Sequence, residues 1–223
     1  MDEIIRIAID GPAGAGKSTV AKAIAARLNI DYVDTGAMYR AIGLYIVRQG
    51  IDIHDKEAVE KAAPDAKVSL TYENGEQVVV LNGENVNGLI RTEEVSQAAS
   101  VTSAYPVVRE LLFEMQQTLA KENDVVMDGR DIGTVVLPNA QAKIYLTASV
   151  EERARRRFEE YKNKGMDVDI EELKKEIAQR DHQDMTREIA PLKQADDAVL
   201  VDSSDMNIDE VTKAIMDIIK ERR

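Results

Sequence analysis

The sequence has 223 residues, of which 44% are hydrophobic, enough for one substantial core, and it has no cysteine, which excludes disulfides and zinc–thiolate sites. Its formal net charge of −12 disfavours nucleic-acid binding. No apolar run approaches the roughly 18 residues that a membrane helix needs, so we expect a cytoplasmic protein with no membrane partner.

Short apolar runs alternate with helical patterns along the chain. The first run, residues 4–9, leads into a glycine-rich loop, and a helical pattern follows over residues 17–28. Helix starts are predicted at Pro106, Ser149, Asp169 and Asn207. Further buried strands are predicted at residues 32–33, 125–127, 142–146 and 198–201. Strands that alternate with helices indicate an α/β fold with a parallel sheet covered on both faces.

The pattern changes between about residues 66 and 90. Val68, Leu70 and Tyr72 alternate with polar residues, and a second apolar run covers residues 78–81. The Asn-Gly pairs at 74–75 and 82–83 are typical of hairpin turns. These features predict a small antiparallel β insertion.

Residues 11–18 read GPAGAGKS and match the phosphate-loop pattern G-x-x-x-x-G-K-[ST] between a strand and a helix. Such a loop turns its backbone N–H groups toward phosphate oxygens at a helix start. We expect Lys17 at the β- and γ-phosphates of ATP and Ser18 at Mg²⁺. The N-K-x-D element of a GTPase has no match, because the nearest candidate, residues 163–166, lacks the aspartate. A small-molecule kinase is therefore favoured.

A second anion site is expected near the motif DTGAMYR. Thr35 is predicted to cap a helix that carries Tyr39 and Arg40, which could hold a monophosphate, although an ordinary capped helix fits equally well. After the strand at 125–127, Asp128 and Arg130 fall at the carboxyl end, where open α/β sheets bind ligands. We expect Asp128 to orient the Mg²⁺ shell and Arg130 to reach the phosphates.

Two later helical segments carry basic residues. Arg153, Arg156 and Arg157 share one helix face and suggest a lid, whereas Arg155 points away. Arg180, Asp184 and Arg187 also fall on one face, though for each helix alone a solvated surface would suffice.

Together these motifs resemble the bacterial-type cytidylate kinases, a branch of the nucleoside monophosphate kinases. The resemblance covers nearly the whole chain, through IDGPAGAGKS, DTGAMYRA, VSQAASVTS, YPVVRE, MDGRDIGTVV, EERARRR, RDHQDMTREIAPL and VLVDSS. It implies a single-domain P-loop kinase fold with a five-stranded parallel sheet flanked by helices, a small antiparallel β insertion and a short helical lid. The implied core spans about 1–60, 91–150 and 186–223, the monophosphate-binding insertion about 61–90 and the lid about 151–185.

The resemblance also implies an activity: a monomeric enzyme transfers the γ-phosphoryl group of ATP to CMP or dCMP with Mg²⁺, giving ADP and CDP or dCDP. The implied nucleotide-binding residues are Gly11, Pro12, Ala13, Gly14, Ala15, Gly16, Lys17, Ser18 and Thr19, with Thr19 sharing the Mg²⁺-related role of Ser18. Thr35, Arg40 and Arg130 would hold the acceptor phosphate, Tyr39 the sugar or base, Ser100, Arg109, Asp131 and Arg187 the cytosine, and Arg180 and Asp184 the ribose or phosphates. Arg157, with Arg153, would close over the transferring phosphate.

Two alternatives remain open at this point. One is a kinase for a different monophosphate or metabolite. The other is a nucleotide-regulated binding switch that hydrolyses ATP slowly.

Overall fold

The computed structural model describes residues 4–73 and 75–222, and a parallel sheet of five strands in the order β2-β6-β1-β7-β8 forms its centre. These strands are β1 (Arg6–Asp10), β2 (Asp31–Asp34), β6 (Val125–Gly129), β7 (Ala142–Thr147) and β8 (Val199–Asp202). Each overlaps one of the predicted strands, and all pair in parallel, as expected.

The helices are α1 (Lys17–Leu28), α2 (Thr35–Arg48), α3 (Lys56–Ala62), α4 (Glu93–Thr102), α5 (Pro106–Glu122), α6 (Val150–Asn163), α7 (Ile170–Thr186) and α8 (Ile208–Glu221), with the short turns η1 (Ala63–Asp65) and η2 (Ile132–Val136). The predicted starts are confirmed: Pro106 opens α5, and Ser149, Asp169 and Asn207 cap α6, α7 and α8.

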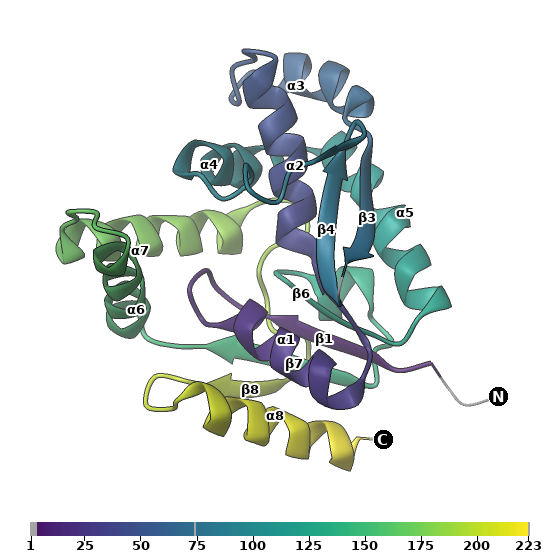
Figure 1. Ribbon diagram of the computed structural model, residues 1–223, viewed down its shortest axis with the longest axis vertical. Helices are drawn as coiled ribbons and strands as arrows, with labels where there is room; N and C mark the ends of the chain where they lie inside the picture. The colour runs from purple at the N-terminus through teal and green to yellow at the C-terminus, as the bar shows by residue number, and fades with distance from the viewer. Residues whose placement is uncertain (1–3, 74, 223) are drawn as a thin grey trace.

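The two faces of the sheet belong to two separate cores, because neighbouring residues of a strand point to opposite sides. Ile9 packs in one core with Ile24 of α1 and Ile215 of α8. Ala8 packs in the other with Met38 of α2, together with residues of α5 and the insertion. Figure 1 shows α1 beside β1 and β7, α8 beneath β8, and α2 rising above the sheet.

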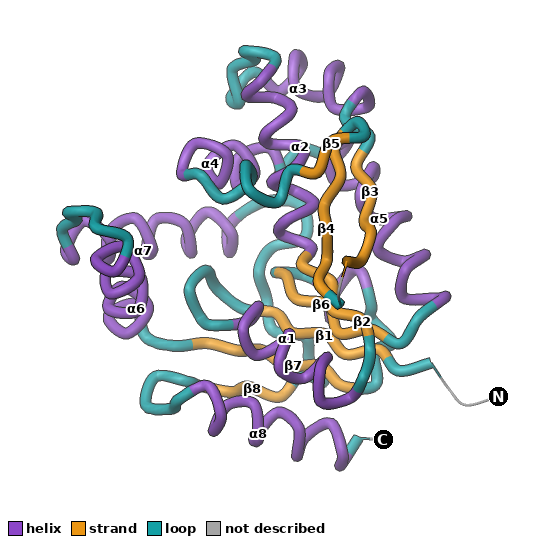
Figure 2. Tube along the Cα trace, viewed as in Figure 1, coloured by secondary structure: helices purple, strands orange, loops and turns teal. Residues whose placement is uncertain are grey.

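The predicted insertion is present as a separate antiparallel sheet of three strands, which stands upright above the central sheet in Figure 2. The strands are β3 (Val68–Glu73), β4 (Glu76–Leu81) and β5 (Glu84–Asn85). Asn82 and Gly83 both have positive φ, 49° and 86°, as the predicted hairpin turn requires. Of the other predicted turn, Asn74 lies outside the described residues.

The insertion sits against the edge strand β2 of the central sheet. Gln77 accepts a hydrogen bond from the Asp34 N–H at 2.8 Å and donates to the Asp34 carbonyl at 3.3 Å. The Tyr72 hydroxyl donates to the Tyr32 carbonyl. Side chains of the insertion thus satisfy backbone groups that an edge strand would otherwise leave unpaired.

Helices α6 and α7 form a hairpin that projects beside the carboxyl ends of the strands (Figure 1). It has a small core of its own, in which Ala154 packs with Leu173 and Ile177. This hairpin covers the segment for which a lid was predicted, and it is called the lid hairpin, or lid, below.

Candidate active site

The phosphate loop joins β1 to α1, and two of its glycines are required by geometry. A Cβ on Gly11 would lie 1.9 Å from the Leu146 carbonyl oxygen, so only glycine fits against β7. Gly16 has φ of 87° and precedes α1, where it leaves the first N–H groups of the helix uncovered by a capping side chain. Exposed N–H groups at a helix start attract anions.

Lys17 lies at the base of this loop. Its ammonium donates to the Pro12 carbonyl at 2.7 Å, and its side chain is buried. Burial and the nearby charge of Arg130 lower the pKa of Lys17 to about 7. Negatively charged phosphate at this position would favour the charged form of the amine.

Ser18 in the first turn of α1 contacts Asp128 near the carboxyl end of β6. The Ser18 hydroxyl donates to Oδ2 of Asp128 at 2.9 Å, and the Tyr32 hydroxyl donates to Oδ1 at 2.8 Å. Burial, reinforced by the charge of Asp34, raises the pKa of Asp128 to about 6. A cation beside this carboxylate would offset the cost of burying its charge.

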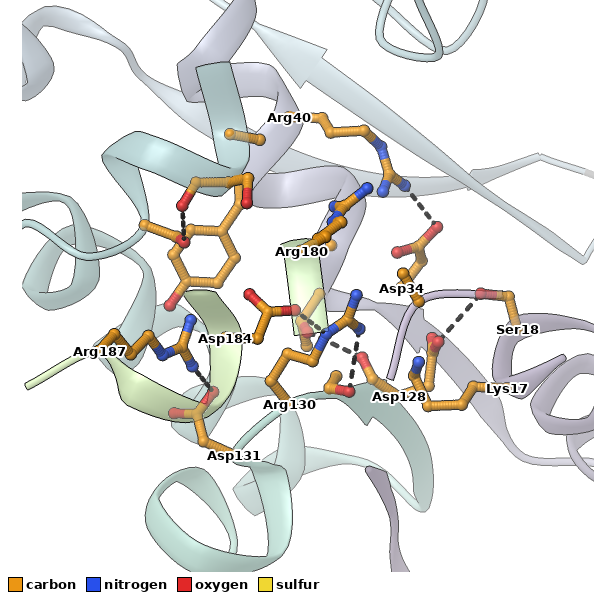
Figure 3. A pocket seen from close by; sticks show the side chains of 18 of the residues that line it. Lys17, Ser18, Asp34, Arg40, Asp128, Arg130, Asp131, Arg180, Asp184 and Arg187 are labelled. Carbon is orange, nitrogen blue, oxygen red and sulfur yellow. Dashed lines mark hydrogen bonds and ion pairs between the residues drawn. The ribbon is translucent and has the colours of Figure 1, made fainter. Parts of the chain in front are cut away.

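A cleft of about 250 Å³, called the inner cleft below, opens at the carboxyl ends of the strands (Figure 3). It contains every residue predicted to contact the monophosphate. Those residues are Thr35, Tyr39, Arg40, Ser100, Arg109, Arg130, Asp131, Arg180, Asp184 and Arg187. The position is the one at which open α/β sheets bind ligands.

The start of α2 differs from the prediction. Asp34, not Thr35, caps the helix, by accepting a hydrogen bond from the Ala37 N–H at 2.8 Å. Thr35 is instead the first helical residue, and its hydroxyl donates to the Asp128 carbonyl at 2.8 Å. Aspartate is the better N-cap of the two residue types, a signal that the sequence contained. Asp34 also accepts from Arg40 at 2.9 Å, so the capping residue orients a predicted phosphate ligand.

The inner cleft holds positive charge that its own carboxylates do not fully offset. Arg130 pairs with Asp184 at 2.8 Å. The Nε atoms of Arg40 and Arg180 are buried and have no hydrogen-bond partner among the described residues. Burial and the charge of Arg130 lower the pKa of Arg180 to about 10. Unpaired guanidinium donors in a cleft are suited to binding phosphate.

Both hydrogen-bond acceptors and donors line the part of the inner cleft around Asp131. Asp131 accepts hydrogen bonds from Arg109 and from Arg187, the latter at 3.3 Å. The Arg109 guanidinium lies 5.8 Å from the centre of the Tyr39 ring, and Ser100 of α4 lines the same cleft. Acceptors and donors therefore sit side by side, as recognition of a polar planar group requires.

A second cleft of about 670 Å³, the outer cleft, lies between the phosphate loop and the lid. Its lining includes residues 13–20 of the loop and first turn, Ile208 and Val211 of α8, and Arg157. Lys17, Arg40 and Arg180 line both clefts, which therefore meet at these three charges. Gly11 and Pro12, predicted to bind nucleotide, lie outside the lining of both clefts as described.

The lid arginines have distinct surroundings. Arg157 donates to the Tyr161 hydroxyl at 2.9 Å and stacks on its ring in the outer cleft. Arg155 is on the opposite, exposed face, as predicted, and pairs with Glu152. Arg156, predicted on the same face as Arg153 and Arg157, also lines the outer cleft and donates to the Ser203 carbonyl at 2.6 Å.

Arg153 lines the outer cleft together with Arg157, and its own contacts also tie the hairpin to the rest of the protein. Its side chain is buried, and its guanidinium donates to the Ala148 and Ala13 carbonyls and to both oxygens of Asp181. These contacts join the start of α6 to α7 and to the phosphate loop. The geometry therefore suits a role in holding the lid in place.

Within the described residues, no three His, Cys, Asp or Glu side chains converge as a metal cage. Nor does any helix in that part of the chain have the length and hydropathy to span a membrane.

The chain is similar to known proteins over nearly its whole length. The family model for cytidylate kinase matches residues 7–221. The chain is 51% identical to the cytidylate kinase of Geobacillus kaustophilus over 100% of this chain and 99% of that protein, and 53% identical to that of Shouchella clausii over 96% of each. Among solved structures, shikimate kinase from Bacteroides thetaiotaomicron shares the fold, with a TM-score of 0.50 at 15% identity over 98% of this chain and 99% of that one.

Proposed function

Since the chain belongs to the cytidylate kinase family, we propose that it transfers the γ-phosphoryl group of ATP to CMP or dCMP, giving ADP and CDP or dCDP. One observation supports this most directly: two clefts, each able to take a phosphorylated ligand, meet at Lys17, Arg40 and Arg180.

ATP would occupy the outer cleft. The N–H groups of the phosphate loop and Lys17 would hold its β- and γ-phosphates, since they surround the start of α1. The apolar side chains of Ile208 and Val211, at the same cleft, would pack against the adenine.

The monophosphate would lie in the inner cleft with its phosphate toward the junction. Arg40 and Arg130 would bind this phosphate, together with the Thr35 N–H at the start of α2, where the helix dipole favours an anion. Arg180 would sit between the two phosphates because it lines both clefts.

The cytosine would occupy the end of the inner cleft lined by Asp131 and Ser100. Their oxygens can accept from its 4-amino group, whereas Arg109 and Arg187 can only donate and suit N3 and the O2 carbonyl. Uracil presents a carbonyl and an N3–H at these places, so it would leave buried polar groups unsatisfied.

Mg²⁺ fits the pair of oxygen donors formed by Ser18 and Asp128. This ion is typically held by one or two protein oxygens while substrate phosphates and water complete its shell. Ser18 and Asp128 would hold the ion, which would supply positive charge against the negative charge that develops during transfer. Thr19 also lines the outer cleft and could support this position.

The transfer itself requires little covalent chemistry from the protein. The acceptor is already an anion and needs no general base, so the arginines have to offset the repulsion between two polyanions and align them. Arg157 would approach the transferring group from the lid, while Arg153 holds the hairpin on the phosphate loop. A closed lid would exclude water, which otherwise competes as acceptor.

ADP release by the full chain with ATP, in the presence and absence of CMP, tests this proposal. Release that depends on CMP and is lost in Lys17→Ala supports it, because that variant lacks the charge at the transferring phosphates. The division into core, insertion and lid, the monomeric state and the cytoplasmic location stay predictions.

A further inference from the structure

Beyond the residues assigned so far, we propose that Arg91 is a positioning residue for the acceptor phosphate, acting through Asp34 on Arg40. This inference rests on the proposed function, since it adds a residue to the same site. Arg91 belongs to the segment that returns from the insertion to α4, a part of the chain with no sequence motif that indicates chemistry.

The backbone around Arg91 is fixed on both sides. Ile90 is buried in the core beneath α2, and Thr92 caps α4 by accepting from the Val95 N–H at 3.3 Å. The side chain of Arg91 therefore starts from a defined position beside the junction of the two clefts, and it lines the outer cleft.

Two arginines share one carboxylate oxygen. Oδ2 of Asp34 accepts from Arg40 at 2.9 Å and from Arg91 at 3.4 Å, while Oδ1 caps α2 (Figure 3 shows Arg40 turned toward Asp34). The backbone of Asp34 is held by Gln77 of the insertion at both its N–H and its carbonyl. Asp34 is thus fixed in place, with a side chain only 9% exposed.

Arg91 changes the net charge around Asp34 and Arg40, and with it the attraction of this site for a phosphate. Asp34 and Arg40 alone form a neutral pair, and a phosphate that approached Arg40 would also meet a buried carboxylate a few ångströms away. Adding Arg91 gives the three groups a net charge of +1, so the unit attracts an anion. Arg40 can then keep its bond to Asp34 through Nη2 while other N–H groups of its guanidinium, which lines the inner cleft, bind the phosphate.

A purely structural role fits Arg91 poorly. Its side chain is 65% exposed and makes this contact at 3.4 Å, and exposed pairs of that kind stabilise a fold little. The chain provides a matched comparison in Arg48, which also joins α2 to the insertion, through a bidentate pair with Glu84 at 2.6 and 3.1 Å. Arg48 lines neither cleft among the described residues.

The test measures kcat and KM for CMP and for ATP in the full chain. We expect Arg91→Gln to raise the KM for CMP and to lower kcat/KM for CMP about fivefold to twentyfold, the size of one weakened charge-assisted hydrogen bond. The KM for CMP should rise more than the KM for ATP, although Arg91 also lines the outer cleft, and the melting temperature should stay near that of the wild type. Arg91→Lys, which keeps the charge, should recover most of the loss, and Arg48→Gln should behave as the wild type does.

A double-mutant cycle with Asp34→Asn tests the route of the effect. Asparagine preserves the cap and the side-chain volume but removes the charge that Arg91 offsets. In that background Arg91→Gln should cause little further loss. Full additivity, or equal losses in Arg91→Gln and Arg48→Gln, would overturn the role of Arg91. If instead the wild type itself shows no CMP-dependent turnover, the proposed function fails.

Discussion

The hydroxyl of Ser18 lies 2.9 Å from Oδ2 of Asp128, although the two residues are 110 positions apart in the chain. The end of β6 brings the carboxylate to the first turn of α1, so that two hard oxygen donors meet beside the phosphate loop. This pairing makes the dependence on Mg²⁺ testable.

Asp128→Asn should raise the Mg²⁺ concentration needed for half-maximal activity about 10- to 100-fold, because it removes the charge that would support the ion. Titration of activity with Mg²⁺ measures this shift. Tyr32→Phe removes only a hydrogen bond to the same carboxylate and should raise the Mg²⁺ concentration needed for half-maximal activity by less. An unchanged Mg²⁺ requirement in Asp128→Asn would place the ion elsewhere.

Arg157→Ala should lower kcat at least about 100-fold with little change in the KM for CMP, since a lid contact made on closure stabilises the transition state selectively. Steady-state kinetics with CMP varied at saturating ATP separate the two parameters. Arg155→Ala is the matched control, because Arg155 lies on the exposed face and pairs with Glu152 and Glu159. A rise in KM alone would instead assign Arg157 to acceptor binding.

Arg153→Ala should lower the free energy of unfolding by about 3 to 5 kcal/mol, because it leaves the mostly buried Asp181 without its partner. Urea denaturation measures the change. The double variant Arg153→Met, Asp181→Leu should recover most of that stability, since no buried charge remains, while Arg155→Ala should stay within about 0.5 kcal/mol of the wild type. If Arg153→Ala hardly changes the free energy of unfolding, Arg153 does not hold the lid hairpin in place.

Asp131→Asn should reduce the ratio of kcat/KM for CMP to that for UMP about 10- to 100-fold, because it replaces one of two acceptor oxygens by an NH₂ group, which can donate to the uracil carbonyl but cannot accept from the cytosine amino group. The isosteric change is preferred to alanine, which would leave Arg109 and Arg187 unpaired. Ser100→Ala should also reduce the ratio of kcat/KM for CMP to that for UMP.

Arg40→Ala is the control for base choice, since Arg40 faces the phosphate and should affect CMP and UMP about equally. A ratio that stays unchanged in Asp131→Asn and Ser100→Ala would remove both residues from the cytosine site.

Much of this site was predictable from the sequence because its parts lie at the ends of recognisable elements. Apolar runs indicated the positions of the strands, and Asp128 and Arg130 lie at the carboxyl end of one of these strands, β6. Helical spacing placed Arg157 and Arg155 on opposite faces, as the structure confirms.

Other features depend on tertiary contacts that periodicity does not encode. Helical spacing put Arg153 beside Arg157, but its burial depends on where α7 places Asp181. Residue preference ranks Asp34 above its neighbour Thr35 as an N-cap, but both can cap a helix, and the backbone shows that Asp34 does. Arg91 lies in a loop, which lacks the periodicity of a helix or strand, so the sequence does not show which way its side chain points.

The most direct test of the proposed function is ADP release from ATP by the full chain, measured without acceptor and then with CMP, dCMP, UMP or AMP. A CMP or dCMP kinase releases ADP rapidly with those two acceptors, more slowly with UMP, and hardly at all with AMP or without acceptor. Equal ADP release in every case would contradict phosphoryl transfer to a monophosphate and indicate a nucleotide-regulated switch, while preference for AMP would indicate a different acceptor site.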